Sequence, residues 1–518
     1  MPPLFKRSLI LIGALLAIVA FSIQANADTI KPTINLDHPV IIADSQSAVY
    51  LLVQFDIPKQ VVDTTEPRPD LNLGMVIDRS GSMSDRGKMS YAIRAANKMV
   101  DQLQPTDHLS VVEYDDRISV LWPSTPVESP SMIKAKIEGL FPRGSTNLTG
   151  GMMRGVEEVM SAIDREKINR VILLSDGLAN TGVTDPREIK RLVRESKQNG
   201  VTITTMGLGL DYNEDLMQMI AENAGGNYYF IENPDQMNAI FQNELGMLFA
   251  TIAKDVRLYF KPSDVVKKVD VYGYLAKIEE NRADIEMEDL FTGEKRSMVI
   301  RLEIMPEGEG KFDVGEFGLS YLDVDENEKK SYTSAIKVES TIDPEKVKEA
   351  TNEDVVIEAT LFEAEEYHNQ QVRLYEEGDI KSAQSNIAGY VDELRVKNDL
   401  LGSVVIDKKI EALEMESDRM DWAEQSVSNK SYYLKQNKAQ YYRAQKGKRG
   451  MYIMQEGDSD YMVQRLKKAL TDKGFYNGEI NEDFTPDLTD AIKEFQKSEN
   501  LTVDGIAGPA TLSALGLY

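Results

Sequence analysis

The 518-residue sequence contains no cysteine, and this absence excludes several kinds of chemistry. The chain forms no disulfides, offers no thiolate ligands for zinc and has no thiol nucleophile. Histidine is also scarce, because His38, His108 and His368 are the only three and fall in three different predicted domains. The HExxH, GxSxG and Walker A patterns are missing as well. Neither a zinc hydrolase, nor a serine hydrolase with a histidine base, nor an ATP-driven machine is therefore expected.

Basic residues are too few to balance the acidic ones. The chain has 59 Lys and Arg against 85 Asp and Glu, which gives a formal net charge of −26. A nucleic-acid partner requires a basic face, and an anionic membrane surface attracts basic segments, so neither partner is expected. The acidic excess is interpreted as a contribution to solubility.

The N-terminus has an apolar run at residues 9–23 that is short for a membrane-spanning helix. Lys6 and Arg7 precede this run, and an Ala-Asn-Ala sequence that ends at residue 27 offers a cleavage site. This pattern predicts a secretory signal peptide over residues 1–27, with an uncleaved membrane anchor as the alternative. After signal cleavage no membrane span is expected. An exported protein without disulfides indicates a bacterial protein of the periplasm, the cell envelope or the extracellular space.

Strand and helix patterns alternate between residues 67 and 249. Apolar strands are predicted at 71–77, 108–114, 118–122, 170–175, 201–208 and 227–231. Helical patterns lie between most of them, at 88–103, 131–140, 150–163, 186–199, 213–224 and 234–248. Strands this apolar are usually covered on both faces, so the pattern predicts a mostly parallel, doubly wound α/β sheet between helix layers. The strands at 108–114 and 118–122 are predicted to form a hairpin.

Two flanking regions, residues 28–66 and 250–342, show the alternation of strands without long helical stretches. Neither has enough strands for a core of its own, so they are predicted to form one β-sandwich that the α/β domain interrupts. Residues 343–447 are charged and helical. The turn-like stretch at 374–387 matches a tetratricopeptide repeat once only, which favours a helical hairpin or spacer over a stacked array. Residues 441–458 are interpreted as a linker.

The α/β domain has oxygen-bearing side chains at three junctions between elements. Asp78, Ser80 and Ser82 follow the first strand, Thr146 stands just before a helix, and Asp176 ends the strand VILLS. Ligands of open α/β sheets bind beyond the carboxyl ends of the strands, so these loops are expected to meet. An all-oxygen set with neutral hydroxyls suits Mg²⁺ or Mn²⁺ better than zinc, with Ca²⁺ as a further candidate. Helix capping and turn formation are the alternative roles for these Ser and Asp residues.

The order Asp-x-Ser-x-Ser, then Thr, then Asp resembles the metal-ion-dependent adhesion site of a von Willebrand factor A domain, a Rossmann-like fold. The resemblance implies that Ser80 and Ser82 bind the cation directly and that Thr146 joins or leaves with conformational state. It implies that Asp78 and Asp176 act directly or through water, and that an open position on the ion accepts an acidic residue of a partner protein. A domain of this kind that interrupts a β-domain resembles bacterial secreted proteins that are similar to the inter-alpha-trypsin-inhibitor heavy chains.

The C-terminal residues 455–518 resemble a small three-helix peptidoglycan-binding domain. Two amphipathic helices are followed by the sequences GFYNG and LTVDGIAGPATLSAL. Lys467 stands where the family usually has Gln, and INEDF at 480–484 lacks the usual Asp-Gly turn. The glycines and proline are interpreted as turn formers, and the wall-binding surface is not assigned residue by residue. The motif residues are Phe495, Gln496, Asp504, Gly505, Gly508 and Pro509.

These features predict an exported, non-enzymatic binding or scaffold protein. Its metal site is expected to hold an acidic residue of a partner protein while its C-terminal domain associates with peptidoglycan. A cell-surface adhesin and a regulatory subunit of a cell-wall hydrolase are the alternatives. A glycosidase that uses two carboxylates also stays open, although no motif among the 85 acidic residues supports it.

Overall fold

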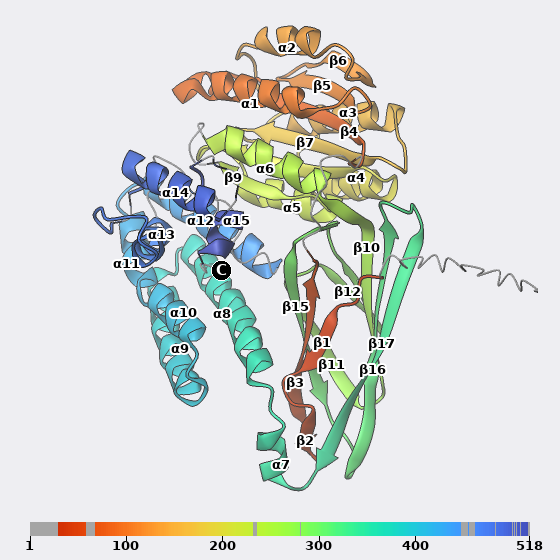
Figure 1. Cartoon of the computed structure of the whole chain (residues 1–518), viewed down its shortest axis with the longest axis vertical. Helices are drawn as coiled ribbons and strands as arrows, with labels where there is room; N and C mark the ends of the chain where they lie inside the picture. The colour runs from red at the N-terminus through yellow and green to blue at the C-terminus, as the bar shows by residue number, and fades with distance from the viewer. Residues whose placement is uncertain are drawn as a thin grey trace, which may run out of the picture.

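The computed structural model describes residues 29–58, 68–231, 236–279, 281–446, 454, 461–481, 483–499, 501, 503, 505–507 and 509–515. The predicted signal peptide lies outside these residues. The described chain forms an α/β domain, a β-sandwich, a helical region and a small C-terminal helical domain (Figure 1). In this part of the chain, none of the helices combines the length and the apolar character needed to cross a membrane.

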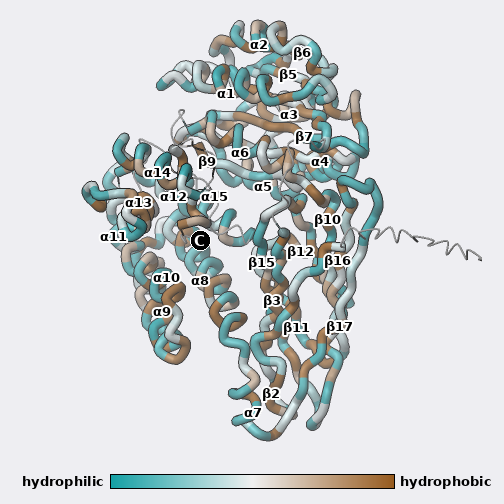
Figure 2. The backbone as a smooth tube through the Cα atoms, in the orientation of Figure 1, coloured by the Kyte–Doolittle hydropathy of each residue, from teal (hydrophilic) through white to brown (hydrophobic). Residues whose placement is uncertain are grey.

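The α/β domain is built on a six-stranded sheet with the strand order β6-β5-β4-β7-β8-β9. All neighbouring strands are parallel except the β5–β6 hairpin, as the sequence predicts. The two central strands, β4 and β7, are buried along their whole length, and Figure 2 shows the apolar colour of this part of the chain. The strands are β4 (Leu71–Asp78), β5 (His108–Tyr114), β6 (Ile118–Pro126), β7 (Ile168–Ser175), β8 (Thr202–Leu208) and β9 (Tyr228–Ile231).

Helices cover both faces of this sheet, so the predicted doubly wound fold is confirmed. Alternate residues of β4 enter two cores: Met75 and Ile77 join the core of one face, whereas Val76 joins that of the other. The first face packs against α1 (Lys88–Gln102), α2 (Pro130–Glu138) and α6 (Met237–Phe249). The second packs against α3 (Leu148–Ser161), α4 (Pro186–Gln198) and α5 (Glu214–Ala224).

The β-sandwich draws strands from both sides of the inserted domain, as predicted. A long strand pairing joins the two flanking regions: β3 (Ser47–Asp56) pairs with β15 (Lys295–Ile304) along its whole length. One sheet has the order β1-β3-β15-β11, and the other has the order β12-β13-β10-β16-β17-β2, with β14 beside β10. The remaining strands are β1 (Thr33–Leu36), β2 (Val40–Ile42), β10 (Thr251–Pro262), β11 (Val266–Tyr272), β12 (Ala276–Glu279), β13 (Arg282–Glu286), β14 (Leu290–Phe291), β16 (Gly310–Asp323) and β17 (Lys329–Thr341).

The helical region joins the sandwich to the α/β domain. Phe362 of α8 packs with Leu52 and Val299 on the outer face of the four-stranded sheet. At the other end, Tyr442 of α12 belongs to the core of the α/β domain, where its hydroxyl donates to Gly226 O at 3.1 Å. The helices are α7 (Pro344–Glu349), α8 (Glu353–Glu376), α9 (Ile380–Leu401), α10 (Val404–Glu414), α11 (Glu416–Ala423) and α12 (Val427–Gln445).

Residues 441–445 of the predicted linker 441–458 are the end of α12, whereas residues 447–453 and 455–458 lie outside the described residues. The C-terminal part of this helix is held on the α/β domain. Lys435 Nζ donates to Tyr212 O at 2.6 Å, and the rings of Tyr442 and Tyr228 meet edge to face at 5.7 Å. Of the basic residues in this segment, Lys446 forms an ion pair at 2.8 Å with Glu288, in the sandwich part of the chain.

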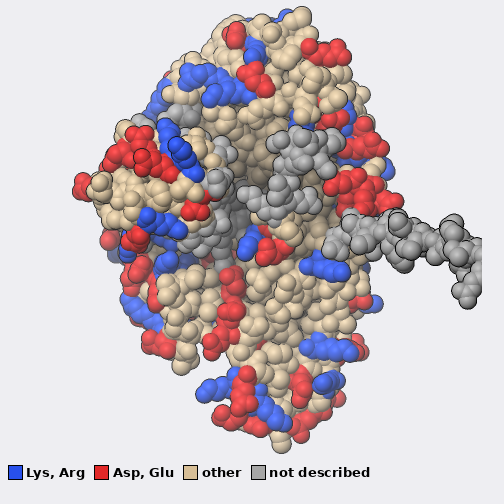
Figure 3. Space-filling view, in the orientation of Figure 1, with Lys and Arg blue, Asp and Glu red and all other residues tan. Residues whose placement is uncertain are grey.

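The C-terminal domain is a compact set of short helices around its own core. Its helices are α13 (Tyr461–Asp472), α14 (Pro486–Ser498) and α15 (Pro509–Ala514). Leu466, Leu488 and Phe495 are fully buried in this core, as the two apolar stripes predict. On the face of the whole molecule in Figure 3, acidic and basic side chains are interspersed over all parts of the chain and do not form one large patch.

The helical region has a buried carboxylate that makes its stability dependent on pH. Glu416 is 1% exposed and lies 3.1 Å from both His368 Nε2 and Arg419 Nη1, while the Tyr433 hydroxyl donates to it at 2.6 Å. Burial alone raises the pKa of Glu416, but His368, Arg419 and Tyr433 together lower it to about 2. The stabilisation is thus present above the ordinary glutamate pKa and is lost as the pH falls towards 2.

We predict that Glu416→Gln weakens the helical region by about 3 kcal/mol at neutral pH and removes this acid sensitivity. Hydrogen exchange of the α11 and α12 amides between pH 7 and about pH 2, in the variant and the wild type, measures both effects. Glu411→Gln is the matched control, because Glu411 is exposed on the adjacent α10. Equal protection of Glu416→Gln and the control would contradict the prediction.

Candidate metal centre

The loop after β4 is organised around the buried carboxylate of Asp78. This carboxylate has no exposed surface; its Oδ1 accepts from Ser80 N at 2.8 Å, and its Oδ2 accepts from Ser175 Oγ at 2.7 Å. Burial is the main influence on the group and raises the pKa of Asp78 to about 6, although bonds from Ser80 and Ser175 oppose the rise. Asp78 therefore ties β4, its loop and the end of β7 together.

The predicted oxygen ligands meet at one edge of the sheet. Ser80 Oγ lies 3.0 Å from Ser82 Oγ, and Ser82 Oγ donates to Asp176 Oδ1 at 2.7 Å. Ser82 lies in the short 3₁₀ segment Gly81–Gly87 that leads into α1, whereas Asp176 directly follows β7. Residues 94 positions apart in the sequence thus form one hydrogen-bonded chain.

Thr146 borders the same space from the loop before α3. It is 3% exposed, and its backbone N–H and C=O bond to the loop after Asp176: Thr146 N donates to Asn180 Oδ1 at 3.0 Å, and Asn180 N donates to Thr146 O at 3.2 Å. A Cβ added at Gly177 would lie 3.1 Å from Thr146 Oγ1 and 3.6 Å from Ser82 Oγ. Gly177 therefore leaves a space that both hydroxyls face.

This donor set fits a hard divalent cation. Three hydroxyl groups and two carboxylates supply only oxygen, and the hydroxyls add no charge, which is the chemistry that Mg²⁺ and Mn²⁺ accept in proteins. The space opposite Gly177 is where Ser82 and Thr146 can both turn a lone pair towards an ion. The five residues predicted from the sequence lie together at this edge of the sheet, with Asp78 set behind the others through Ser175 and the Ser80 backbone.

The structure adds residues that the sequence pattern did not single out. Lys88, the first residue of α1, is buried, and its Nζ donates to Asp176 Oδ2 at 2.7 Å. The hydroxyls of Ser175 and Tyr114 support Asp78 from β7 and β5. A lysine at a helix start suggests a solvated side chain, so no local signal marks Lys88. Ser175 did have a signal, because it is a polar residue that ends an otherwise apolar strand.

A second group of charged residues lies behind the loop that follows β4, and its positive and negative charges are equal in number. Arg79 is 3% exposed and lies 3.1 Å from Glu113 and 3.0 Å from Asp115, and Arg143 reaches Asp115 at 3.1 Å. Two guanidinium groups thus face two carboxylates. These ion pairs hold the ends of β4 and β5 and the loop before α3 together without adding net charge to the site.

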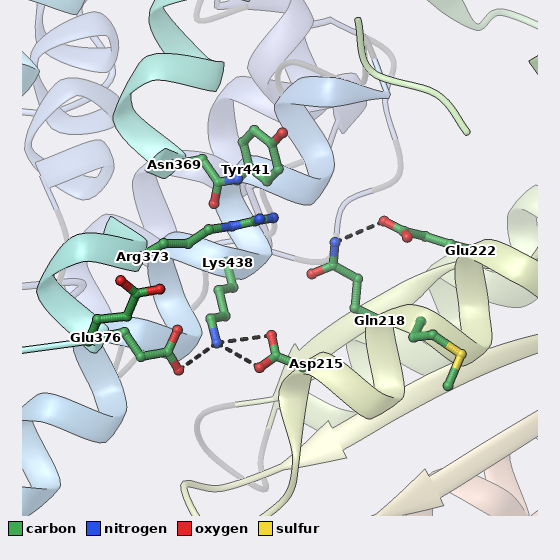
Figure 4. A pocket seen from close by; sticks show the side chains of 10 residues that line it. Asp215, Gln218, Glu222, Asn369, Arg373, Glu376, Lys438 and Tyr441 are labelled. Carbon is green, nitrogen blue, oxygen red and sulfur yellow. Dashed lines mark hydrogen bonds and ion pairs between the residues drawn. The ribbon is translucent and has the colours of Figure 1, made fainter. Parts of the chain in front are cut away.

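A separate acidic cluster lies between α5 and the helical region, beside a cavity of about 450 Å³ (Figure 4). Carboxylate oxygens of Glu214, Asp215 and Glu376 lie within 4.8 Å of one another. The ammonium of Lys438 already occupies their meeting point, at 2.9 Å from both Asp215 and Glu376. We interpret this cluster as the anchor of α12 and not as a metal site.

The motif residues of the C-terminal domain have structural roles where they are described. Phe495 lies in the core, and Gln496 Oε1 accepts from Gly505 N at 2.9 Å while its Nε2 donates to Ile506 O at 2.9 Å. Gly505 has a φ of 77°, which favours glycine. Pro509 begins α15, whereas Asp504 and Gly508 lie outside the described residues. Lys467 is buried and donates to Asn481 at 2.6 Å, so it joins the first helix to the following loop.

Comparison with family models matches two parts of the chain. Residues 72–243 match the von Willebrand factor type A domain, and residues 459–515 match a putative peptidoglycan binding domain. The Escherichia coli K12 protein YfbK is 28% identical over 247 residues, which are 46% of this chain and 43% of that protein. Human inter-alpha-trypsin inhibitor heavy chain H4 is 27% identical over 228 residues, which are 39% of this chain and 24% of that protein. The matches thus span less than two thirds of these relatives.

Solved structures share the fold at low sequence identity. A von Willebrand factor type A protein from Catenulispora acidiphila has a TM-score of 0.59 at 17% identity and covers 77% of this chain and 91% of its own. The ArnB paralog VWA2 from Sulfolobus acidocaldarius has a TM-score of 0.52 at 17% identity, with 81% and 98% covered. The shared fold therefore covers more of the chain than the α/β domain alone.

We predict that Gly177→Ala lowers the affinity for Mg²⁺ by roughly tenfold or more, because the new methyl group fills the space before Thr146 and Ser82. Isothermal titration of the full chain with MgCl₂ measures the change. Gly81→Ala is the matched control in the same site, since its Cβ would meet only Gly144 O at 3.5 Å. If the two variants bind Mg²⁺ equally well, the space opposite Gly177 is not the ion's position.

Proposed function

We propose that this chain, which joins a von Willebrand factor type A domain to a peptidoglycan-binding domain, is an exported, non-enzymatic binding protein. Its α/β domain holds a divalent cation, and the cation binds an acidic side chain of a partner protein. Its C-terminal domain keeps it at the cell wall, in the periplasm or the outer envelope.

The observation that carries this proposal is the convergence of Ser80, Ser82 and Asp176 beside the space that Gly177 leaves open. Neutral hydroxyl ligands leave most of the charge of a bound ion uncompensated. A bound magnesium ion also keeps some positions for water, and an outside carboxylate can replace such a water. Ser80, Ser82 and Thr146 would orient the ion, while Asp78 and Asp176 would fix these hydroxyls from behind.

The rest of the molecule suits a binding role. The site lies at an edge of the α/β sheet, while the sandwich part of the chain holds this domain through the Arg170–Asp289 ion pair and α12 holds it through Lys435. The wall-binding domain is a separate core at the end of the chain, so anchoring and partner binding use different surfaces. The scarcity of histidine and the lack of cysteine leave a binding function as the simplest one for this set of domains.

The test is capture of envelope proteins on the full mature chain, in magnesium buffer and in EDTA. We expect a partner that is retained in magnesium, released by EDTA and lost with Ser82→Ala, because Ser82 links the first loop to Asp176. Ser84→Ala is the control in the same segment, since the Ser84 hydroxyl is exposed and bonds only to Gly81 O. Retention that is identical in both buffers, or unaffected by Ser82→Ala, would refute the metal-dependent mode of binding.

Purified sacculi test the anchoring and enzymatic parts of the proposal separately. The full chain should sediment with sacculi, and a chain that lacks residues 459–515 should stay in solution. No soluble muropeptides should be released in either case. Clear muropeptide release by the pure protein would instead identify a cell-wall hydrolase.

A further inference from the structure

The metal centre contains a cation of its own. The side chain of Lys88 is 5% exposed and runs from α1 to the loops after β7 and β8. Its Nζ lies 2.7 Å from Asp176 Oδ2, and a Cβ added at Gly209 would lie 3.5 Å from the same nitrogen. Among the residues that the structure describes, Asp176 is the only carboxylate within ion-pair distance of this ammonium. Burial of a charge at this depth is costly unless it is paired, so the contact is a fixed part of the site.

Lys88 and Ser82 each donate a hydrogen bond to a different oxygen of the Asp176 carboxylate. Oδ1 accepts from Ser82 and Oδ2 accepts from Lys88, each at 2.7 Å. Asp78 is used in the same way, because its two oxygens accept from Ser80 N and Ser175 Oγ. Both carboxylates are therefore satisfied within the protein. The Ser80, Ser82 and Thr146 hydroxyls are the groups that stay available to an ion.

The charges of the site follow from this arrangement. The Arg79 and Arg143 pairs with Glu113 and Asp115 are balanced, which leaves Asp78 and Asp176 opposed by Lys88. Without an ion, the site has one net negative charge. With a divalent ion, it has one net positive charge, which one acidic side chain neutralises. Were Lys88 neutral, the ion-loaded site would already be neutral before any ligand arrived.

We propose that Lys88 is a built-in counter-cation that lowers the affinity of the site for its metal ion and raises the affinity of the loaded site for an anionic ligand. This inference rests on the proposed function. The ammonium stabilises Asp176 when no ion is bound, so the metal-free domain keeps its loops in place. It repels the incoming ion at close range in a poorly solvated site, and it adds to the attraction between the loaded site and a carboxylate.

The proposal predicts opposite effects on metal and ligand when Lys88 loses its charge. In the full chain, Lys88→Met should bind Mg²⁺ roughly fivefold more tightly or better in calorimetric titration. It should bind acetate at least about threefold more weakly in the Mn²⁺-loaded state, as measured by the paramagnetic relaxation of ¹³C-acetate. The Tm of the metal-free chain should fall, because Asp176 loses its buried partner. Lys88→Arg, which keeps the charge, should restore both affinities towards those of the wild type.

Lys98→Met is the matched control, since Lys98 is exposed on the same helix and its loss should change neither affinity. A purely structural role for Lys88 would weaken metal and acetate binding together, and that result would overturn the proposal. Unchanged affinities in Lys88→Met would overturn it as well. If Lys88→Met does not fold without an ion but folds in saturating magnesium, the result supports the proposal. If Lys88→Met does not fold under either condition, the same metal and acetate affinities are measured with Lys88→Gln, which also removes the charge.

The outcomes separate this inference from the proposed function. If Mg²⁺ binds to the wild type and to Lys88→Met with equal affinity, the function stands and the inference about Lys88 fails. If Mg²⁺ binds only to Lys88→Met, the ammonium of Lys88 blocks the site in the wild type. The metal-dependent function then fails, whereas the inference that Lys88 lowers the affinity for the metal ion is supported. If neither protein binds Mg²⁺, both proposals fall.

Discussion

The site depends on one physical constraint: two carboxylates end the central strands of the sheet with no contact to water. Asp78 and Asp176 have no exposed surface, and charges in such a place must be paired or bonded. The backbone of Ser80 and the hydroxyl of Ser175 satisfy the first carboxylate, and Ser82 and Lys88 satisfy the second. These bonds orient the hydroxyls, so the geometry of the candidate metal site is a consequence of how the fold compensates its buried charges.

The same reasoning explains what the sequence could and could not predict. Uniformly apolar strands that alternate with helical patterns predicted the doubly wound domain, and the spacing of Asp78, Ser80 and Ser82 marked the loop, because such signals are local. The partnership of Lys88 with Asp176 and the burial of Tyr442 in the α/β core are contacts between residues far apart in the sequence. Lysine and tyrosine near helix ends are usually solvated or half-exposed, so nothing near them in the sequence indicated these contacts.

The helical region packs against both the sandwich and the α/β domain. α8 packs on the sandwich through Phe362, and α12 packs on the α/β domain through Tyr442 and Lys435. The strand pairing of β3 with β15 joins the two parts of the sandwich that flank the inserted domain. A partner bound at the metal centre would therefore be connected to the sandwich through packed elements. The chain then leads on to the C-terminal domain, which matches a putative peptidoglycan binding domain.

The most direct test of this account is the anomalous scattering of crystals of the full chain grown with MnCl₂. We expect an anomalous peak in contact with the hydroxyls of Ser80 and Ser82, with Lys88 still bonded to Asp176. A peak at the Glu214, Asp215 and Glu376 cluster in place of this site, or no peak at the ends of β4 and β7, would contradict the account.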